Sequence, residues 1–442
     1  MVERKGKALQ FSDIYGKLRS ERIQRLSKEG FWIVLGQAMA VVGSLVGVRV
    51  LTGLLNPSAY GELALGMTVA TLVNQVILGP LGNGITRFYA PSVEKNDLTG
   101  YLKATGRLLF WATGLIILLI PFAAIGLLLT GQAKWIAIVT TAFIFALVSG
   151  YNGIFSGIQN AARQRSIVAF HQGIQPWLQY LIAASLLVWL GATSTNAMMG
   201  YAVAILLVNG SLYYFFRSNF SKHATRAKDE KNWREKILNY SWPFAAWGVF
   251  TWLQLSSDRW ALGYFATTKV VGMYAVLFQL GYYPISIATS IVSQLLAPIY
   301  FQRAGDATDS YRNTHVSIIN WRLTKFVLGL TIVAFIVTFI FHAQIFGLLV
   351  ADEYRSVSYL LPWLTFSAGL FAAGQINALN LMSQMKTNKM VIAKVVTALL
   401  GVLLNFIGAY AYGINGIVAA SFIFSIMYFL WMVFFNLTDS VG

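Results

Sequence analysis

The chain has 442 residues, of which 57% are hydrophobic and only 11% are charged. This composition excludes an ordinary soluble protein and indicates a polytopic membrane protein. The absence of cysteine excludes disulfides, thiolate metal sites and cysteine nucleophiles, and the formal net charge of +17 raises the question of a nucleic-acid partner.

The first 30 residues form a basic segment that holds eight Lys and Arg against four Asp and Glu. Phe11, Ile14, Tyr15 and Leu18 recur at helical spacing, which favours an amphipathic segment on an anionic inner leaflet. A solvated tail that is held inside by its charge is the equal alternative. The segment lacks a short apolar core with a small-residue cleavage site, so it does not read as a secretory signal.

From residue 31 onward, apolar runs of about 20 residues repeat along the chain, and this length spans a bilayer as a helix. They predict an all-α polytopic membrane protein whose twelve transmembrane helices form two pseudo-symmetric six-helix bundles around a central cleft. The predicted spans are 31–55, 61–85, 105–129, 134–158, 167–190, 196–216, 241–265, 270–300, 319–348, 359–383, 391–411 and 414–436. The predicted domains are the basic segment 1–30, the bundle 31–216, a cytoplasmic linker 217–240, the bundle 241–436 and a cytoplasmic tail 437–442.

A short sequence echo supports duplication of the two halves. Arg49-Val-Leu-Thr-Gly53 followed by Gly61 resembles Arg259-Trp-Ala-Leu-Gly263 followed by Gly272. The first five positions are offset by 210 residues, and one residue is inserted before the last glycine. Internal duplication is common among secondary transporters, whose binding sites lie between the repeats.

The distribution of basic residues predicts the topology. With the N-terminus inside, 28 of the 33 Lys and Arg side chains lie in inner segments, and only Lys134, Lys269 and Arg355 lie in outer loops. Arg49 and Arg259 lie within the membrane. This strong positive-inside bias places both termini in the cytoplasm of a multi-pass protein. It also argues against nucleic acid, because the basic residues do not form one compact face.

Polar residues inside the predicted spans form stripes along single helix faces. Hydrogen bonds between helices explain any one of these residues. A stripe that continues over four turns is less costly if it faces a shared water-filled cavity, because unpaired amides in lipid are unfavourable. The residues expected to line this cavity are Gln254, Asp258, Gln279, Tyr282, Tyr283, Ser286, Asn152, Gln159, Gln175, Asn377 and Asn380.

Charged residues at membrane depth mark a pathway, a partner or a site, since each costs about 2.5–3.5 kcal/mol or more there. Arg49 and Arg259 have two interpretations: they bind an anion in the cavity, because Arg suits bidentate phosphate contact, or they snorkel to outer head groups. Glu62 and Asp258 are the carboxylates at or inside membrane depth. Each binds a coupling ion, H⁺ or Na⁺, or pairs with an arginine, and the second reading is slightly favoured.

Four stretches carry a family resemblance: residues 49–63 (RVLTGLLNPSAYGEL), residues 79–87 (GPLGNGITR), Ser156-Gly-Ile-Gln159, and Asp258-Arg259 with Gly263 and Gly272-Met-Tyr274. Together with the layout of residues 31–436, they resemble the bacterial oligosaccharide and polysaccharide flippases of the O-antigen type. These flippases belong to the multidrug/oligosaccharidyl-lipid/polysaccharide superfamily. One departure is Val270-Val271, where relatives often have an acid, so any role of that acid is absent.

The resemblance implies a flippase that carries a polyprenyl-pyrophosphate-linked glycan from the inner to the outer leaflet of the bacterial cytoplasmic membrane by alternating access. Its implied partners are the lipid-linked glycan, membrane lipids and polysaccharide assembly proteins. Amides, hydroxyls and aromatic faces suit the glycan, and Arg49, Arg259, Arg87 and Arg163 are expected to meet the pyrophosphate. Topology alone also explains Arg87 and Arg163.

Three other functions stay open, and the polar stripes favour one of them least, a static scaffold or lipid-surface anchor. A cation-coupled drug or metabolite exporter of the same superfamily would favour carboxylates in its cavity, whereas this chain offers interior arginines and few acids. A membrane-embedded polysaccharide polymerase or acyltransferase would need a substantial catalytic loop or an acid and histidine cluster, yet the outer loops are short. No phosphate-binding Gly-xxxx-Gly-Lys-Ser/Thr motif supports direct use of ATP. We therefore expect no catalytic residue, metal or cofactor.

Overall fold

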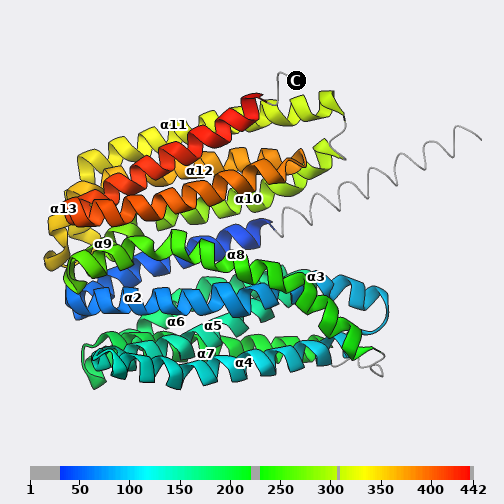
Figure 1. The fold of residues 1–442 in the computed structure, drawn as a ribbon, viewed down its shortest axis with the longest axis horizontal. Helices are drawn as coiled ribbons and strands as arrows, with labels where there is room; N and C mark the ends of the chain where they lie inside the picture. The colour runs from blue at the N-terminus through cyan, green and yellow to red at the C-terminus, as the bar shows by residue number, and fades with distance from the viewer. Residues whose placement is uncertain (1–29, 221–228, 306–308, 439–442) are drawn as a thin grey trace, which may run out of the picture.

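The computed structural model describes residues 30–220, 229–305 and 309–438 (Figure 1). Every regular element within these residues is helical, which confirms the predicted all-α class. The predicted basic segment 1–30 lies outside the described residues except for Gly30. Residues 221–228 of the predicted linker and residues 439–442 of the predicted tail also lie outside them.

Successive long helices run in alternating directions, so that residues 30, 230 and 438 lie at one end of the molecule (Figure 1). We call this the residue-30 end, and we call the opposite end, where α2 and α9 begin, the closed end. The elements are the N-terminal helix Gly30–Leu54, α2 Pro57–Val73, a π-helical turn Asn74–Leu78, α3 Gly79–Glu94, α4 Leu98–Leu129, a 3₁₀ turn Ala133–Trp135, α5 Ile136–Ala161, α6 Arg165–Leu190, α7 Ser194–Phe220, α8 Glu230–Phe265, α9 Thr268–Gly281, α10 Tyr283–Ala304, α11 Ser310–Leu349, a 3₁₀ segment Asp352–Leu360, α12 Leu361–Ser383 and α13 Thr387–Thr438.

Ten helices among the described residues are long and apolar enough to cross a membrane. The predicted eighth span is divided at Tyr282 into α9 and α10, because Pro284 begins a new helix. The eleventh and twelfth spans are joined in α13, which is broken at Gly413 with φ 56°. Helix α8 has 36 residues but is outside the ten, and the exact arrangement of twelve spans in two equal bundles stays a prediction.

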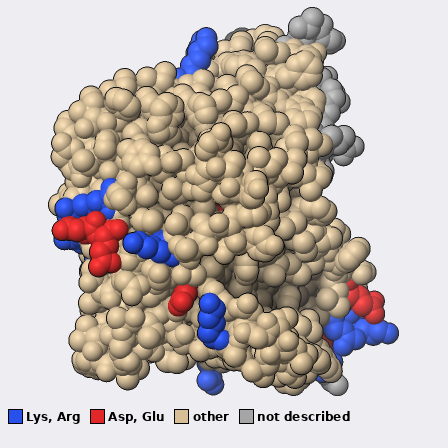
Figure 2. Space-filling model, turned by 60° about the vertical axis from the view of Figure 1, so that its left-hand side comes forward, with Lys and Arg blue, Asp and Glu red and all other residues tan. Residues whose placement is uncertain are grey.

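The outer surface is suited to lipid. Figure 2 shows a broad uncharged face on which Lys, Arg, Asp and Glu gather in a few small groups. Helices α4 and α11 are mostly exposed, with large side chains such as Phe110, Phe122, Phe326 and Phe339 more than half exposed. Since hydrocarbon rather than water surrounds such side chains in a membrane, the chain is a multi-pass membrane protein.

At the closed end, α2 and α9 begin in the same way, one in each half of the chain. Asn56 caps α2 by accepting a hydrogen bond from the Ala59 amide, and Thr267 caps α9 in the same way from Val270. Such caps satisfy backbone donors that the first turn leaves without partners. Gly61 and Gly272, the glycines of the sequence echo, each lie five residues after their cap. The echo therefore corresponds to equivalent local structure.

Gly61 and Gly272 bring α2 and α9 into backbone contact. A Cβ on Gly61 would lie 1.9 Å from the Thr268 carbonyl oxygen, and a Cβ on Gly272 would lie 1.9 Å from that of Pro57. Each position therefore requires glycine, and the two contacts are reciprocal. We call the helices from the N-terminal helix to α7 the first group and those from α9 to α13 the second group. The two glycine contacts hold these groups together at the closed end.

Helix α8 connects the two groups of helices (Figure 1). Its first half contacts α3 and α4, and α8 as a whole also packs on α13. Asp97, which is buried, fixes its start: the carboxylate accepts hydrogen bonds from the amides of Gly100 and Asp229 and from the Trp233 indole. Lys95 and Lys236 both lie over the Trp233 ring. This polar joint anchors the second half of the chain to the first.

Candidate functional site

A cavity of about 650 Å³, lined by polar and apolar residues, lies between the two groups of helices. Its lining comes from the N-terminal helix and from α2, α6, α7, α8, α9 and α10. The polar lining residues are Gln37, Ser44, Tyr60, Thr68, Thr71, Gln172, Gln175, Gln179, Tyr180, Tyr201, Ser256, Arg259, Gln279, Tyr282, Tyr283 and Ser286. This lining provides amides, hydroxyls and aromatic rings, with one charged side chain among them.

On the side toward the closed end, the cavity ends at a bridge of two hydrogen bonds that Gln279 makes with Tyr60 and Tyr180. Tyr60 donates to the Gln279 side-chain oxygen at 3.0 Å, and the Gln279 nitrogen donates to the Tyr180 hydroxyl at 2.9 Å. These residues come from α2, α9 and α6, so Gln279 joins the second half of the chain to two helices of the first. Beyond this bridge, the contact between Gly61 and Gly272 closes the path.

Arg259 lines the cavity, and its side chain is 15% exposed. Its Nη1 donates to the Leu255 carbonyl at 2.9 Å and lies 3.4 Å from Oδ1 of Asp258. The guanidinium carbon lies 4.6 Å from the centre of the Phe278 ring. The contact with Asp258 is long, so Arg259 keeps donors available for an anion in the cavity.

Asp258 faces a second, smaller chamber of about 60 Å³, which adjoins the large cavity at Leu255, Phe278 and Tyr282. Tyr274 donates to Oδ2 of Asp258 at 2.7 Å, and the carboxylate is buried. Gln254, Asn405, Ser421 and Ser425 complete the polar lining of this chamber. The adjacent residues Asp258 and Arg259 thus serve different compartments, as the helical angle between them predicts.

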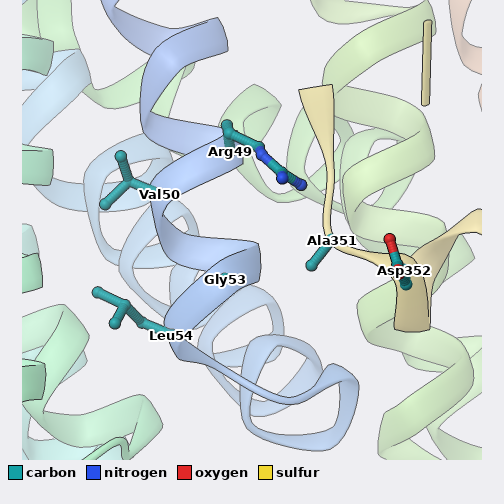
Figure 3. Close-up of a pocket in the computed structure, with 6 residues that line it drawn as sticks. All are labelled: Arg49, Val50, Gly53, Leu54, Ala351 and Asp352. Carbon is teal, nitrogen blue, oxygen red and sulfur yellow. The ribbon is translucent and has the colours of Figure 1, made fainter. Parts of the chain in front are cut away.

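Arg49 does not lie on the central cavity. It reaches from the N-terminal helix toward the segment before α12, where its Nη1 donates to the Val350 carbonyl (Figure 3). A shallow pocket of about 470 Å³ surrounds it, lined also by Ala351 and Asp352. Nearby, Thr52 accepts a hydrogen bond from the Ala351 amide. In this conformation Arg49 is exposed and contributes to the closed end. Its predicted roles, anion binding or snorkelling to outer head groups, stay predictions.

The other charged residues predicted for the site, Arg87, Arg163 and Glu62, do not line the central cavity. Arg87 and Arg163 are exposed near the residue-30 end, and Arg163 has a positive φ of 62° in the turn between α5 and α6. Glu62 accepts a hydrogen bond from Ser194 on α7 at 2.8 Å. The roles predicted for these three residues, in pyrophosphate binding and ion coupling, stay predictions.

Several predicted lining residues lie on the two chambers: Gln175, Gln279, Tyr282, Tyr283 and Ser286 on the large one, and Gln254, Asp258 and again Tyr282 on the small one. Four others lie in contacts between helices instead. Asn152 donates to Asn209, Gln159 to the Leu212 carbonyl, Asn377 to Thr324 and Asn380 to Asn436. These amides stabilise helix packing, because in a dry interface each polar group needs a partner.

Sequence reasoning missed Gln37, Ser44, Tyr60, Tyr180 and Tyr201 as lining residues. Gln37 and Ser44 are seven residues apart, which places them on one face of the N-terminal helix. The tyrosines gave a weaker signal, because tyrosine is also common at membrane interfaces. Within the described residues, no group of three His, Cys, Asp or Glu side chains is arranged to hold a metal ion.

Comparisons with known proteins agree with this architecture. Residues 26–304 match the model of a family described as polysaccharide biosynthesis protein. The fold is similar to an inward-facing multidrug resistance MATE family transporter of the MOP superfamily, with a TM-score of 0.72, 13% identity, and coverage of 91% of this chain and 95% of that one. No curated protein matches the sequence.

Two further solved structures share the fold. The lipid II flippase MurJ in an inward closed conformation has a TM-score of 0.66 and 14% identity, over 92% of this chain and 86% of that one. An outward-facing MATE transporter has a TM-score of 0.60 and 15% identity, over 93% and 96%. These likenesses show a shared fold.

Proposed function

Because the chain belongs to the polysaccharide biosynthesis protein family, we propose that it is a flippase and not an enzyme. Its substrate is a polyprenyl-pyrophosphate-linked oligosaccharide, the repeat unit of a polysaccharide. The protein carries the head group from the inner to the outer leaflet by alternating access, while the polyprenyl tail stays in the lipid. One of its fold relatives is named as a lipid II flippase, which supports this class of cargo.

The observation that carries the proposal is the chemistry of the central cavity. Its glutamines, hydroxyls and tyrosine rings match a glycan, which presents many hydroxyl groups and apolar ring faces. Its single charged residue, Arg259, supplies donors for a pyrophosphate. The cavity volume of about 650 Å³ lies in the range typical for binding sites of moderate size.

The described conformation supports loading from one side. The end with Gly61 and Gly272 is shut, whereas the cavity extends toward Gln37, which lies only seven residues from the residue-30 end. In the proposed orientation, the residue-30 end lies on the cytoplasmic side of a bacterial inner membrane, and the positive-inside distribution of Lys and Arg supports this side. Under this orientation the cavity receives substrate from the inner leaflet. Both termini then lie in the cytoplasm.

Replacement of Arg259 tests the proposal. In proteoliposomes loaded with a fluorescent polyprenyl-pyrophosphate oligosaccharide, we expect Arg259→Gln to slow translocation about tenfold to hundredfold, because one charge-assisted phosphate contact is lost. Arg259→Lys should retain part of the activity, and Lys134→Gln, in the turn between α4 and α5, serves as the matched control. Translocation by Arg259→Gln at the wild-type rate would refute anion binding in the cavity and the proposed function with it.

We further propose that the small chamber binds the coupling ion, H⁺ or Na⁺, at Asp258. The chamber offers a buried carboxylate beside the Tyr274 hydroxyl, the Asn405 amide and two serines, and oxygen atoms are the ligands that hard cations prefer. In the same proteoliposomes, Asp258→Asn should abolish stimulation by a Na⁺ or pH gradient but leave the basal exchange of substrate. Undiminished stimulation in that variant would exclude Asp258 as the ion site.

The second candidate is a cation-coupled exporter, which the similarity to MATE transporters favours. Such a transporter would bind organic cations in the cavity. The positive charge of Arg259 opposes this reading, since a like charge raises the free energy of a bound cation. Protection of cells against cationic drugs by the wild-type chain, lost in a cavity variant such as Gln279→Ala, would support the exporter over the flippase.

A further inference from the structure

Another cavity, which the proposed function does not use, opens between α3, α4 and α8. It has a volume of about 620 Å³, and we call it the α4–α8 groove. Its lining residues are Val76, Ile77, Pro80, Leu81, Leu108, Trp111, Ala112, Leu115, Arg234, Leu238, Ser241, Trp242 and Ala245. Trp111 and Trp242 are 66% and 70% exposed, so the groove opens on the outer surface that faces lipid.

The groove is separate from the central cavity because α8 lies between them. A Cβ on Gly248 would lie 1.9 Å from the Gln75 carbonyl oxygen, so the two backbones are in contact there. Trp252 and Trp260 donate hydrogen bonds from α8 to the backbone and side chain of Thr68. A molecule in the groove therefore meets the membrane and not the substrate cavity.

The dimensions of the groove match one leaflet. Along α8 it extends from Arg234 to Ala245, which at the rise of an α-helix is about 16 Å. The hydrocarbon core of a bilayer is about 30 Å thick, so half of it is about 15 Å. Arg234 lies one turn from the start of α8, at the residue-30 end, and the apolar lining extends toward the middle of the membrane.

The charge at the end of the groove favours an anion. Arg234 is half-buried and makes no hydrogen bond or ion pair with another residue in the part of the chain that the structure describes. Residues 103–107 and 230–236 hold five basic and two acidic side chains, and one of the acids, Glu230, is paired with Arg107 at 2.7 Å. The Ser241 hydroxyl, which is buried on the groove wall, has no hydrogen-bond partner among the described residues.

We propose that the α4–α8 groove binds an anionic glycerophospholipid from the leaflet at the residue-30 end. Its acyl chains lie along the apolar walls, and its phosphodiester accepts hydrogen bonds from Arg234. The bound lipid fills the space between α4 and the first half of α8. It thereby stabilises the packing of α8, the helix that joins the two groups, against the first group.

Native mass spectrometry of the full chain from mixed micelles tests this site. We expect the wild type to retain one phosphatidylglycerol at least about tenfold more tightly than phosphatidylcholine, since the net charge of the head group distinguishes the two. Arg234→Gln should abolish this preference. Arg217→Gln removes an exposed charge in the last turn of α7, also at the residue-30 end, and should keep the preference for phosphatidylglycerol. Equal retention of both lipids by the wild type would overturn the proposal.

A groove-filling variant keeps the test informative if Arg234→Gln fails to fold. Leu115 is 47% exposed on the groove wall, and Leu115→Trp should reduce the retained phosphatidylglycerol without changing helix content. Unchanged retention in this variant would contradict the proposed position of the acyl chains. Displacement of phosphatidylglycerol by an equal amount of polyprenyl phosphate would assign the groove to a substrate tail and refute the proposal. Neither result bears on transport through the central cavity.

Discussion

Substitution of Gly272 by alanine should open the closed end. The added Cβ would lie 1.9 Å from the Pro57 carbonyl oxygen, whereas such contacts are essentially never shorter than 3.0 Å, so α2 and α9 must separate by at least 1.1 Å. Both sides of the contact are backbone and cannot move aside as a flexible side chain would. Overpacking of this kind costs about 1–3 kcal/mol, which would change the ratio of closed to open molecules by about 5-fold to 150-fold.

The natural absence of cysteine makes the assay direct. A Ser44→Cys variant places one thiol on the cavity, and a membrane-impermeant maleimide applied at the closed end should label it faster when Gly272→Ala is added. Gly61→Ala should act alike, because its Cβ would lie 1.9 Å from the Thr268 carbonyl oxygen. Gly53→Ala, with nothing within 4 Å of the added Cβ, is the control. Labelling of folded Gly272→Ala at the unmodified rate would refute the closure by backbone contact.

Three further predictions follow from single contacts. Asp97→Ala should lower the free energy of unfolding by about 2–4 kcal/mol, measured by thermal unfolding in detergent, because the buried Trp233 indole and two amides lose their acceptor. Gln279→Leu should increase labelling of the cavity thiol from the closed end, because the bridge between the two tyrosines is lost, while the melting temperature changes by only a few degrees. Single cysteines at Gln132 and Gln164 should react from opposite sides of the membrane, with Gln132 outside; labelling from the same side would contradict the proposed topology.

The sequence was most informative where one residue fixes a local conformation. Gly413 lies in the gap left between two predicted spans, and its positive φ does break α13 there. The repeated glycines Gly61 and Gly272 indicated duplication, and the structure shows that they meet. Hydrophobic periodicity and helix breakers are local properties, so they can be read without knowledge of the neighbouring helices.

The sequence alone did not predict which polar side chains line the cavity and which lie in contacts between helices. Asn377 and Gln279 both appear as amides on polar helix faces, yet Asn377 bonds to Thr324 inside a helix contact and Gln279 lines the cavity. An amide has the same hydrogen-bonding groups in either place, so only the neighbouring helix decides. The contact of Arg49 with the Val350 carbonyl could not be predicted for the same reason, because the two residues lie 301 positions apart.

Arg49 and Arg259, the two arginines of the sequence echo, have different surroundings in the two halves of the chain. Arg49 and Arg259 occupy equivalent positions in the repeated motif, but Arg49 bonds to Val350 at the closed end, whereas Arg259 faces the central cavity. If both faced the cavity, two positive charges would repel each other there and hold an anion more tightly. A transporter must also release its cargo, so a cavity with one arginine favours turnover over retention. The other arginine is then free to stabilise the conformation in which the cavity faces the residue-30 end.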